Sequence, residues 1–158
     1  MTASPVRLRP LVLDDVPILE SATATPEAAG LDWFGFQSPD QLRRTIAGGT
    51  ALGEVGNPGG MLAVATEDAA VGMLTWHPQI YGPNRYPAIN FGVGIVPEER
   101  GKGYGTEAQR LLADYLFAHT NVNRVEAQTD VENVAEQRSL EKVGFLREGV
   151  LRGAQFRD

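Results

Sequence analysis

A glycine-rich turn at residues 100–105 constrains the fold of this chain more than any other feature. Its sequence, Arg-Gly-Lys-Gly-Tyr-Gly, separates an apolar stretch typical of a strand from an amphipathic stretch typical of a helix. With few side chains in the turn, backbone N–H groups face the start of that helix, where the helix dipole also favours an anion. Arg100 and Lys102 add positive charge there. The turn predicts a strand–turn–helix unit that binds a phosphate-bearing cofactor.

The composition narrows the classes of partner. A chain of 158 residues is about one domain in length, so we expect a single domain over residues 1–158. The net charge of −6 argues against nucleic acid as the main partner. No apolar run approaches a membrane span and no signal-peptide core opens the chain, so we expect no membrane partner and a cytoplasmic location. With no cysteine and only two histidines, far apart, we expect no metal.

Hydrophobic periodicity predicts a mixed α/β fold. The clearest helix has apolar residues at i, i+3, i+4, i+7 and i+8 from Ala108 to Leu116. Strand, helix and strand follow one another there, which implies a crossover and local parallel pairing. Helices are predicted at 14–22 (with Asp14 as N-cap), 38–49, 106–119 and 133–143. Strands are predicted at 6–10, 61–66, 71–76, 88–96 and 124–129, and a last one begins at 145–151; the stretches 23–37, 54–60 and 77–87 are predicted as loops.

Two glycines inside the strand predicted at 88–96 carry their own signal. Gly92 and Gly94 in a strand suggest a bulge, or a place where another group approaches the backbone closely. The strand predicted at 61–66 is followed by Glu67-Asp68 and a second strand, which predicts a hairpin.

The glycine turn could also belong to a dinucleotide-binding fold. Its pattern, G-x-G-x-x-G, directly follows a strand, with an acidic residue about twenty positions on. Here Thr106 occupies the third glycine position, and four residues separate the strand from the turn. Glu126 and Asp130 fall roughly where a ribose-binding acid would lie. An NAD(P)-dependent oxidoreductase therefore stays a minority hypothesis.

The string VGIVPEERGKGYGTEA, followed by a helix that Asn133 leads and by EKVGF at 141–145, resembles the GNAT acetyltransferase superfamily. It is most similar to the branch of ribosomal-protein N-terminal acetyltransferases and their relatives. The family motif [Q/R]-x-x-G-x-[G/A] is met by Arg100, Gly103 and Gly105. The resemblance implies a central mixed sheet flanked by helices, with a splayed, bulged central strand, and acetyl-CoA as co-substrate.

The resemblance also implies a set of cofactor-binding residues. The backbone N–H groups of residues 100–106 would hold the pyrophosphate, and Val93, Gly94 and Ile95 would pair with the pantetheine arm as an added strand. One N–H there, at Val93 or Ile95, would polarise the thioester carbonyl, and we take Ile95 as catalytic. Asn133 would contact the cofactor arm or cap the helix. The turn residues so implied are Arg100, Gly101, Lys102, Gly103, Tyr104, Gly105 and Thr106.

The acid–base residues depart from the family pattern. Leu140 stands where some members have a tyrosine, and Asn90 and Gln128 stand where others have a carboxylate. Glu136 replaces the serine of the ribosomal branch and is our candidate acid or base, although Asn133-x-x-Glu136 is also a capping box. Other groups that could serve as base are His77, Tyr81 and Glu20, while Trp33, Phe34 and Phe36 could line the acceptor pocket or plug the core.

These residues predict an N-acetyltransferase in which an amine attacks acetyl-CoA directly. A non-catalytic acyl-CoA-binding module is the alternative, because the usual tyrosine and carboxylates are missing. The acceptor is expected to be a small-molecule amine or a protein N-terminus, and a homodimer is one option for the assembly. The family's final strand, after residues 148–152, is not found before residue 158.

Overall fold

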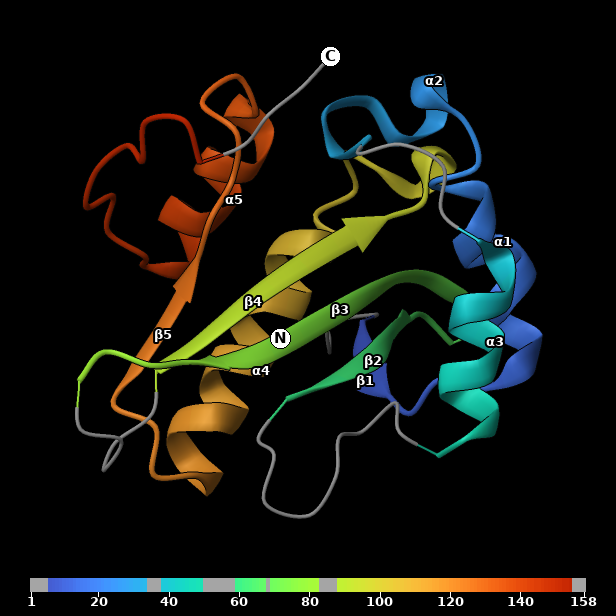
Figure 1. The fold of residues 1–158 in the computed structure, drawn as a ribbon, viewed down its shortest axis with the longest axis horizontal. Coiled ribbons are helices and arrows are strands. Elements are labelled where there is room, and N and C mark those ends of the chain that lie inside the picture. Colours follow the sequence, from blue (N-terminus) through green and yellow to red (C-terminus); the bar gives the residue numbers. More distant parts are fainter. Residues whose placement is uncertain (1–5, 34–37, 50–58, 68, 83–87, 155–158) are drawn as a thin grey trace.

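A computed structural model describes residues 6–33, 38–49, 59–67, 69–82 and 88–154, and these form one sheet with helices on both faces (Figure 1). The strands are β1 (Arg7–Arg9), β2 (Gly60–Ala65), β3 (Ala70–Gln79), β4 (Ala88–Ile95) and β5 (Arg124–Ala127). The α-helices are α1 (Val16–Ser21), α2 (Pro26–Ala29), α3 (Pro39–Ala47), α4 (Tyr104–His119) and α5 (Val134–Val143). Short 3₁₀ turns lie at Leu13–Asp15, Gly30–Asp32 and Pro97–Glu99.

The sheet is mixed, as the sequence predicts. Its five strands lie in the order β1-β2-β3-β4-β5, and every neighbouring pair up to β4 is antiparallel. The pair β4–β5 is parallel, because α4 carries the chain back along the sheet between them. The predicted hairpin between β2 and β3 is confirmed. A doubly wound parallel sheet, which a dinucleotide-binding fold requires, is not the architecture of the described chain.

Alternating side chains bury both faces of the sheet. Val64 and Leu74 face a cluster that contains Ala108 and Leu112 of α4. Ala63 and Met73, one position away along the same strands, face Leu19 of α1 and its neighbours on the other side. In Figure 1, α4 lies behind the sheet, while α1 and α3 stand at the end away from β5. On the face of the sheet opposite α4, helices α1 and α3 therefore cover mainly β2 and β3.

Strands β4 and β5 start together and then separate. Their pairing runs from Ala88↔Arg124 to Phe91↔Ala127 and goes no further, although β4 continues to Ile95. Figure 1 shows the two strands diverging toward their carboxyl ends. The predicted splay is therefore confirmed, and residues 92–95 present an edge that β5 does not pair.

The bulge expected at Gly92 and Gly94 is absent from the ladder between β3 and β4. The register there runs unbroken from Gly72↔Ile95 to Gln79↔Ala88. A register shift occurs instead between Val64 and Ala65 of β2. An extra residue in this ladder therefore does not explain the two glycines.

Several element boundaries differ from the sequence prediction. Asp14 is not an N-cap: a 3₁₀ turn precedes α1, and the residue before the helix is Asp15. Strand β3 extends through His77 to Gln79, because these residues pair with β4. Helix α4 begins at Tyr104 rather than Thr106.

Two further predictions fail within the described chain. The short helix α2 lies in a stretch that we predicted as a loop, since Thr25 accepts a hydrogen bond from the Ala28 N–H (3.2 Å) and caps it. Residues 145–154 form no strand in the structure, so the last strand predicted at 145–151 is wrong. Most of the loop predicted at 54–60, together with Phe34 and Phe36, lies outside the described residues.

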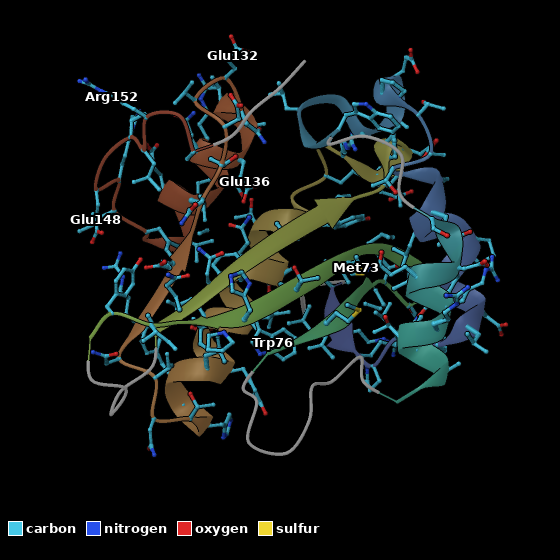
Figure 2. The ribbon with its side chains drawn as sticks, in the orientation of Figure 1. Met73, Trp76, Glu132, Glu136, Glu148 and Arg152 are labelled. Atoms are coloured by element: carbon cyan, nitrogen blue, oxygen red, sulfur yellow. The ribbon has the colours of Figure 1, made fainter. Side chains whose placement is uncertain are left out.

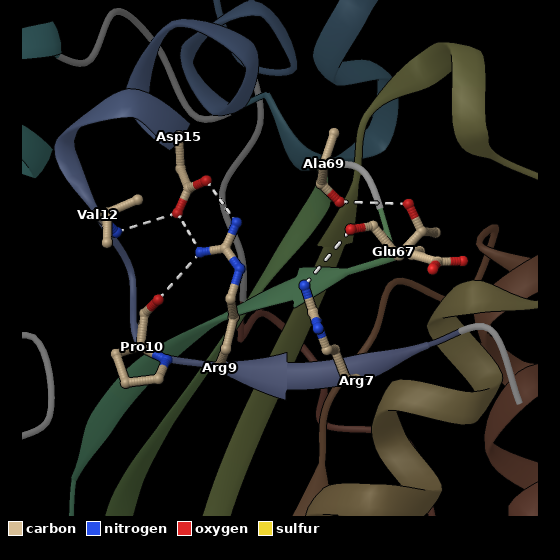
Figure 3. A network of polar contacts seen from close by, with 8 residues as sticks. Arg7, Arg9, Pro10, Val12, Asp15, Glu67 and Ala69 are labelled. Atoms are coloured by element: carbon tan, nitrogen blue, oxygen red, sulfur yellow. Dashed lines mark hydrogen bonds and ion pairs between the residues drawn. The ribbon is translucent and has the colours of Figure 1, made fainter.

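An ion pair fixes the entry to α1. The Asp15 carboxylate accepts two hydrogen bonds of 2.7 Å from the Arg9 guanidinium and a third, of 3.0 Å, from the Val12 N–H (Figure 3). Asp15 is buried, with 5% of its surface exposed. The bonds from Arg9 hold the pKa of the Asp15 carboxyl below its usual value, against the opposing effect of burial.

Replacing Asp15→Asn should cost about 1.5–3 kcal/mol of unfolding free energy at pH 7, the usual worth of a hydrogen bond to a charged group. Because the pKa is lower in the folded state, this stabilisation is present above the unfolded-state pKa of about 3.9 and is lost as pH falls through the folded-state pKa. Urea unfolding of both proteins at pH 7 and at about pH 3 measures it. A difference that does not shrink with acid would contradict this role of the ion pair.

Asp40→Asn is the matched control for that experiment. The Asp40 carboxylate is 65% exposed and lies 3.7 Å from Arg44 in an (i, i+4) pair on α3. Exposed pairs of this kind contribute about 0.5 kcal/mol or less, so the control should unfold almost like the parent at both pH values.

Gly72 lets β3 approach the end of β4. A Cβ at this position would lie 2.3 Å from the Gly94 carbonyl oxygen and 2.7 Å from Ile95 Cδ1. Backbone cannot yield as a side-chain tip can, so any larger residue must push the end of β4 away from β3.

Gly72→Ala should therefore cost about 1–3 kcal/mol, the range of overpacked sites. Gly149→Ala is the control, since a Cβ there meets none of the described residues within 4 Å; its effect should be about 0.5 kcal/mol or less. Thermal and urea unfolding compare them, and equal stability of the two variants would show that the end of β4 is free to move.

Candidate active site

The glycine turn opens directly onto the first turn of α4. Gly101 (φ 77°) and Gly103 (φ 84°) adopt left-handed conformations that other residues rarely take. Gly103 is the N-cap and offers no side chain, and the first hydrogen bond of the helix runs from the Glu107 N–H to the Gly103 carbonyl (3.1 Å). By helix geometry, the N–H groups of residues 104–106 precede that bond and point out of the helix start. The turn thus has the form of an anion site made of backbone.

The two cations of the turn bind the protein itself. Arg100 donates from Nε to the Ile95 carbonyl and from Nη2 to the Ala28 carbonyl, both at 2.9 Å. Lys102 Nζ lies 2.8 Å from Glu99 Oε2, and this hydrogen bond raises the pKa of Lys102. The sequence assigns both residues to the cofactor through their place in the turn. The structure directs both side chains to protein partners, and the Arg100 N–H also donates to the Pro97 carbonyl (3.3 Å).

The open edge of β4 presents alternate backbone groups. The Val96 N–H donates to the Val71 carbonyl (3.0 Å) beside the pair Gly72↔Ile95, which makes Gly72↔Ile95 a non-hydrogen-bonded pair. The N–H groups of Val93 and Ile95 consequently face away from β3, toward the side where β5 has separated. From the family resemblance, we expect one of these two N–H groups to polarise a carbonyl.

Little side-chain volume covers this edge. The side chains of Val93 and Ile95 pack against the core cluster beside α4, so Gly92 and Gly94 lie on the opposite face and are exposed. A Cβ at Gly94 would meet none of the described residues within 4 Å. Gly105 meanwhile brings α4 close, since its Cβ would lie 3.5 Å from Ile95 Cγ1. The backbone of β4 is therefore exposed at Gly92 and Gly94, on the face opposite α4.

A polar network joins α4 to α5 beside that edge. Glu136 projects from α5 toward α4 (Figure 2), and its Oε1 accepts a 2.6 Å hydrogen bond from Gln109 Nε2. Gln109 has no exposed surface, and its Oε1 accepts from Ser139 Oγ at 3.3 Å. Ser139 Oγ lies 2.8 Å from Thr106 Oγ1 at the start of α4. Hydrogen bonds thus connect the start of α4, next to the glycine turn, to the Glu136 carboxylate.

Asn133 caps α5, and only half of the capping box forms. Its Oδ1 accepts from the Glu136 N–H (3.2 Å), as predicted. The Asn133 N–H donates to the Asp130 carbonyl (3.0 Å) rather than to the Glu136 side chain. The Glu136 carboxylate is therefore used between the helices and not in the cap.

The residues that depart from the family pattern, and the other candidate bases, lie in different parts of the fold. Leu140 packs against the core cluster, and its hydrocarbon side chain has no proton to donate to a leaving thiolate. Gln128 is exposed just past β5, and His77 is exposed on β3 opposite Asn90. Glu20 pairs with Arg43 through Oε2 (3.1 Å), and its Oε1 is buried with no hydrogen-bond partner among the described residues. Trp33 is half-buried after the second 3₁₀ turn.

Sequence reasoning did not predict the contacts of Glu126, which lies where β4 and β5 are still paired. Glu126 is 8% exposed and faces Asn90 across the parallel pair. Its Oε1 accepts from Tyr81 Oη (2.9 Å) and Asn90 Nδ2 (3.5 Å), and its Oε2 accepts from Arg124 Nε (2.6 Å). In the sequence Glu126 stood out only as a ribose-binding acid; the strand register was the missing signal.

The surroundings of Glu126 keep it ionised. Burial alone would raise its pKa, but the bonds from Arg124, Tyr81 and Asn90 outweigh burial and hold the pKa below its usual value. The hydrogen bond from Tyr81 Oη to Glu126 also raises the pKa of Tyr81, so Tyr81 stays protonated and donates to the carboxylate. Arg124 also binds Glu148 (2.6 Å), which ties the segment after α5 to β5.

Neither a metal cluster nor a membrane span occurs in the part of the chain that the structure describes. No three histidine, cysteine, aspartate or glutamate side chains there gather closely enough to ligate a metal ion. None of the helices in the described ranges is long and apolar enough to cross a bilayer.

The sequence profile of the acetyltransferase (GNAT) domain matches residues 6–146. The chain is 35% identical over 88 residues to a probable N-acetyltransferase, YjcK, of Bacillus subtilis, covering 56% of this chain and 48% of that protein. The match thus spans about half the length of that relative. The chain belongs to the GNAT acetyltransferase domain family, as the resemblance predicted.

Solved structures share the fold. A RimL ribosomal L7/L12 alpha-N-protein acetyltransferase in complex with coenzyme A superposes with a TM-score of 0.78 at 18% identity, covering 99% of this chain and 88% of that one. A chimera of the Vibrio cholerae spermidine N-acetyltransferase SpeG with hSSAT gives 0.75 at 23% identity, covering 98% and 89%. These similarities confirm the mixed sheet with flanking helices.

Gln109→Leu should destabilise the protein by about 1–3 kcal/mol, because it removes the hydrogen bond from Gln109 to the Glu136 carboxylate inside the α4–α5 contact. A double-mutant cycle with Glu136→Ala, measured by urea unfolding, should give a coupling free energy of about 1 kcal/mol or more. Gln109→Leu combined with Arg138→Ala, on the exposed side of α5, should be additive. Additivity in the Glu136 cycle would show that the network contributes nothing.

Proposed function

We propose that this protein transfers the acetyl group of acetyl-CoA to a primary amine by direct attack on the thioester. The observation that carries the proposal is the edge of β4 at residues 92–95, which β5 leaves unpaired and which leads straight into the backbone anion site of α4. Membership of the GNAT family supports acyl transfer in general.

The residues fit such a cofactor. Left-handed Gly101 and Gly103 keep Cβ atoms out of the turn, so N–H groups of residues 101–106 would bind the pyrophosphate, while the Arg100 N–H bonds the Pro97 carbonyl. Val93, Gly94 and Ile95 would pair with the pantetheine arm as an added strand on the open edge. Asn133 would keep the start of α5 in place beside that arm through its cap. The RimL structure is in complex with coenzyme A, which supports coenzyme A as the class of ligand.

The chemistry requires one charge to be stabilised and one proton to be moved. When the amine nitrogen bonds to the thioester carbonyl carbon, the oxygen gains negative charge, and the outward N–H of Ile95 or of Val93 would stabilise it. The C–S bond then breaks, and the sulfur ends with the proton that the nitrogen gives up. Glu136, held by Gln109, would transfer that proton, directly or through water.

The acceptor is proposed only as a class. The RimL and SpeG structures carry names that state a ribosomal protein N-terminus and spermidine as acceptors of those proteins. A primary amine, either a protein N-terminus or a small molecule, covers both. We also propose that the chain acts as a single domain in the cytoplasm, and that a homodimer is an assembly worth testing.

Isothermal titration should show micromolar binding of acetyl-CoA and no binding of NADH, and an amine screen should show free CoA released with acetylated product. Gly103→Glu should abolish acetyl-CoA binding, because a carboxylate at the start of α4 repels the pyrophosphate and fills the turn. Binding without turnover on any amine would favour the non-catalytic acyl-CoA-binding module instead. Unchanged affinity of the variant would mean that the turn is not the phosphate site.

The control must separate repulsion from backbone strain. Gly49 has a φ of 72°, and a Cβ at this position, as at Gly103, would meet none of the described residues within 4 Å. It follows α3, an element that contributes no residue to the proposed cofactor site. Gly49→Glu should cost a similar amount of stability, about 1 kcal/mol, and leave acetyl-CoA affinity unchanged.

A further inference from the structure

Arg100 joins three segments that are far apart in the sequence. It lies between the last residues of β4 and the glycine turn, and its guanidinium reaches the carbonyl of Ala28 in α2, 72 residues away. The same guanidinium binds the Ile95 carbonyl, five residues back, so one planar group spans the two carbonyls. Figure 1 shows α2 beside the turn that follows β4.

Helix α2 depends on contacts from outside itself. With four residues it is far below the length at which a helix is stable alone. Thr25 caps its N-terminus, and the Gly30 N–H closes its last turn by donating to the Pro26 carbonyl. The Ala28 carbonyl belongs to the end that a short helix leaves without an internal partner, and Arg100 supplies the donor there.

The Ile95 carbonyl lies on the open edge of β4. Because Ile95 belongs to a non-hydrogen-bonded pair with Gly72, its backbone groups face the side that β5 has left. Arg100 occupies that carbonyl at 2.9 Å, which fixes the end of β4 where the strand turns toward the glycines.

We propose that the Arg100 side chain is a positioning residue that locks α2 against the cofactor-binding end of β4, and is not a phosphate ligand. Its role in transfer rests on the function proposed above, whereas its hold on α2 does not. Through it, the segment between α1 and α3 and the edge that binds the thioester are kept in one arrangement. Loss of Arg100 should therefore change the acceptor KM or kcat more than the affinity for acetyl-CoA.

Arg100→Lys tests the proposal, because it keeps the charge and removes the planar fork. In the protein without ligand, amide hydrogen exchange of the peptide that contains Pro26–Ala29 should become about three- to tenfold faster in Arg100→Lys and in Arg100→Ala alike. Arg110→Gln, an exposed arginine of α4 paired with Glu107 and Asp114, is the matched control and should leave that peptide unchanged. Unchanged exchange in both Arg100 variants would overturn the proposal.

Ligand binding separates positioning from phosphate binding. If Arg100 acts by position, both variants keep acetyl-CoA affinity within about threefold and keep its salt dependence, while the acceptor KM rises or kcat falls by about tenfold or more. If Arg100 binds phosphate, Arg100→Ala weakens acetyl-CoA binding, flattens its salt dependence, and Arg100→Lys restores both; that result would overturn the proposal. If the parent protein itself acetylates no amine, the proposed function is refuted, and the exchange result still decides whether Arg100 holds α2.

Discussion

The early end of the β4–β5 pairing is the constraint on which the site depends. Parallel pairing holds the strands together as far as Phe91 and Ala127, and beyond that point the two strands diverge. If the ladder continued, β5 would take the outward N–H groups of Val93 and Ile95. Since it does not, these two N–H groups face away from β3 with no strand of the described chain beside them, and the glycine turn follows the end of β4.

Near that edge, several polar side chains form hydrogen bonds with other groups of the protein. Gln109, fully buried, binds the carboxylate of Glu136, and Arg100 binds two backbone carbonyls. Where β4 and β5 still pair, Glu126 is held by Arg124 and Tyr81 next to Asn90. Each of these contacts fixes an element of the site relative to its neighbours. The proposed anion site itself consists of backbone N–H groups, so its geometry depends on how these elements are held.

The sequence predicted the parts of this arrangement that depend on local pattern. Glycine spacing, the periodicity of α4 and the Asn133 cap are local signals, and the turn, the helix and the cap are where they indicated. The failures have a common cause. The strand expected at 145–151 needs a neighbour to pair with, β3 extends through His77 because β4 does, and Glu126 meets Asn90 only through register. The sequence pattern also could not reveal that the Arg100 guanidinium bonds the Ala28 carbonyl, because Ala28 is 72 residues away in the sequence.

The most direct test is residue-resolved amide hydrogen exchange by NMR, with and without acetyl-CoA. We expect slower exchange at the N–H groups of Val93 and Ile95 and across residues 101–106, with little change at α3. Protection confined to other elements, or a β4 edge whose exchange ignores the ligand, would contradict the claim that the opened strand and the glycine turn form the cofactor site.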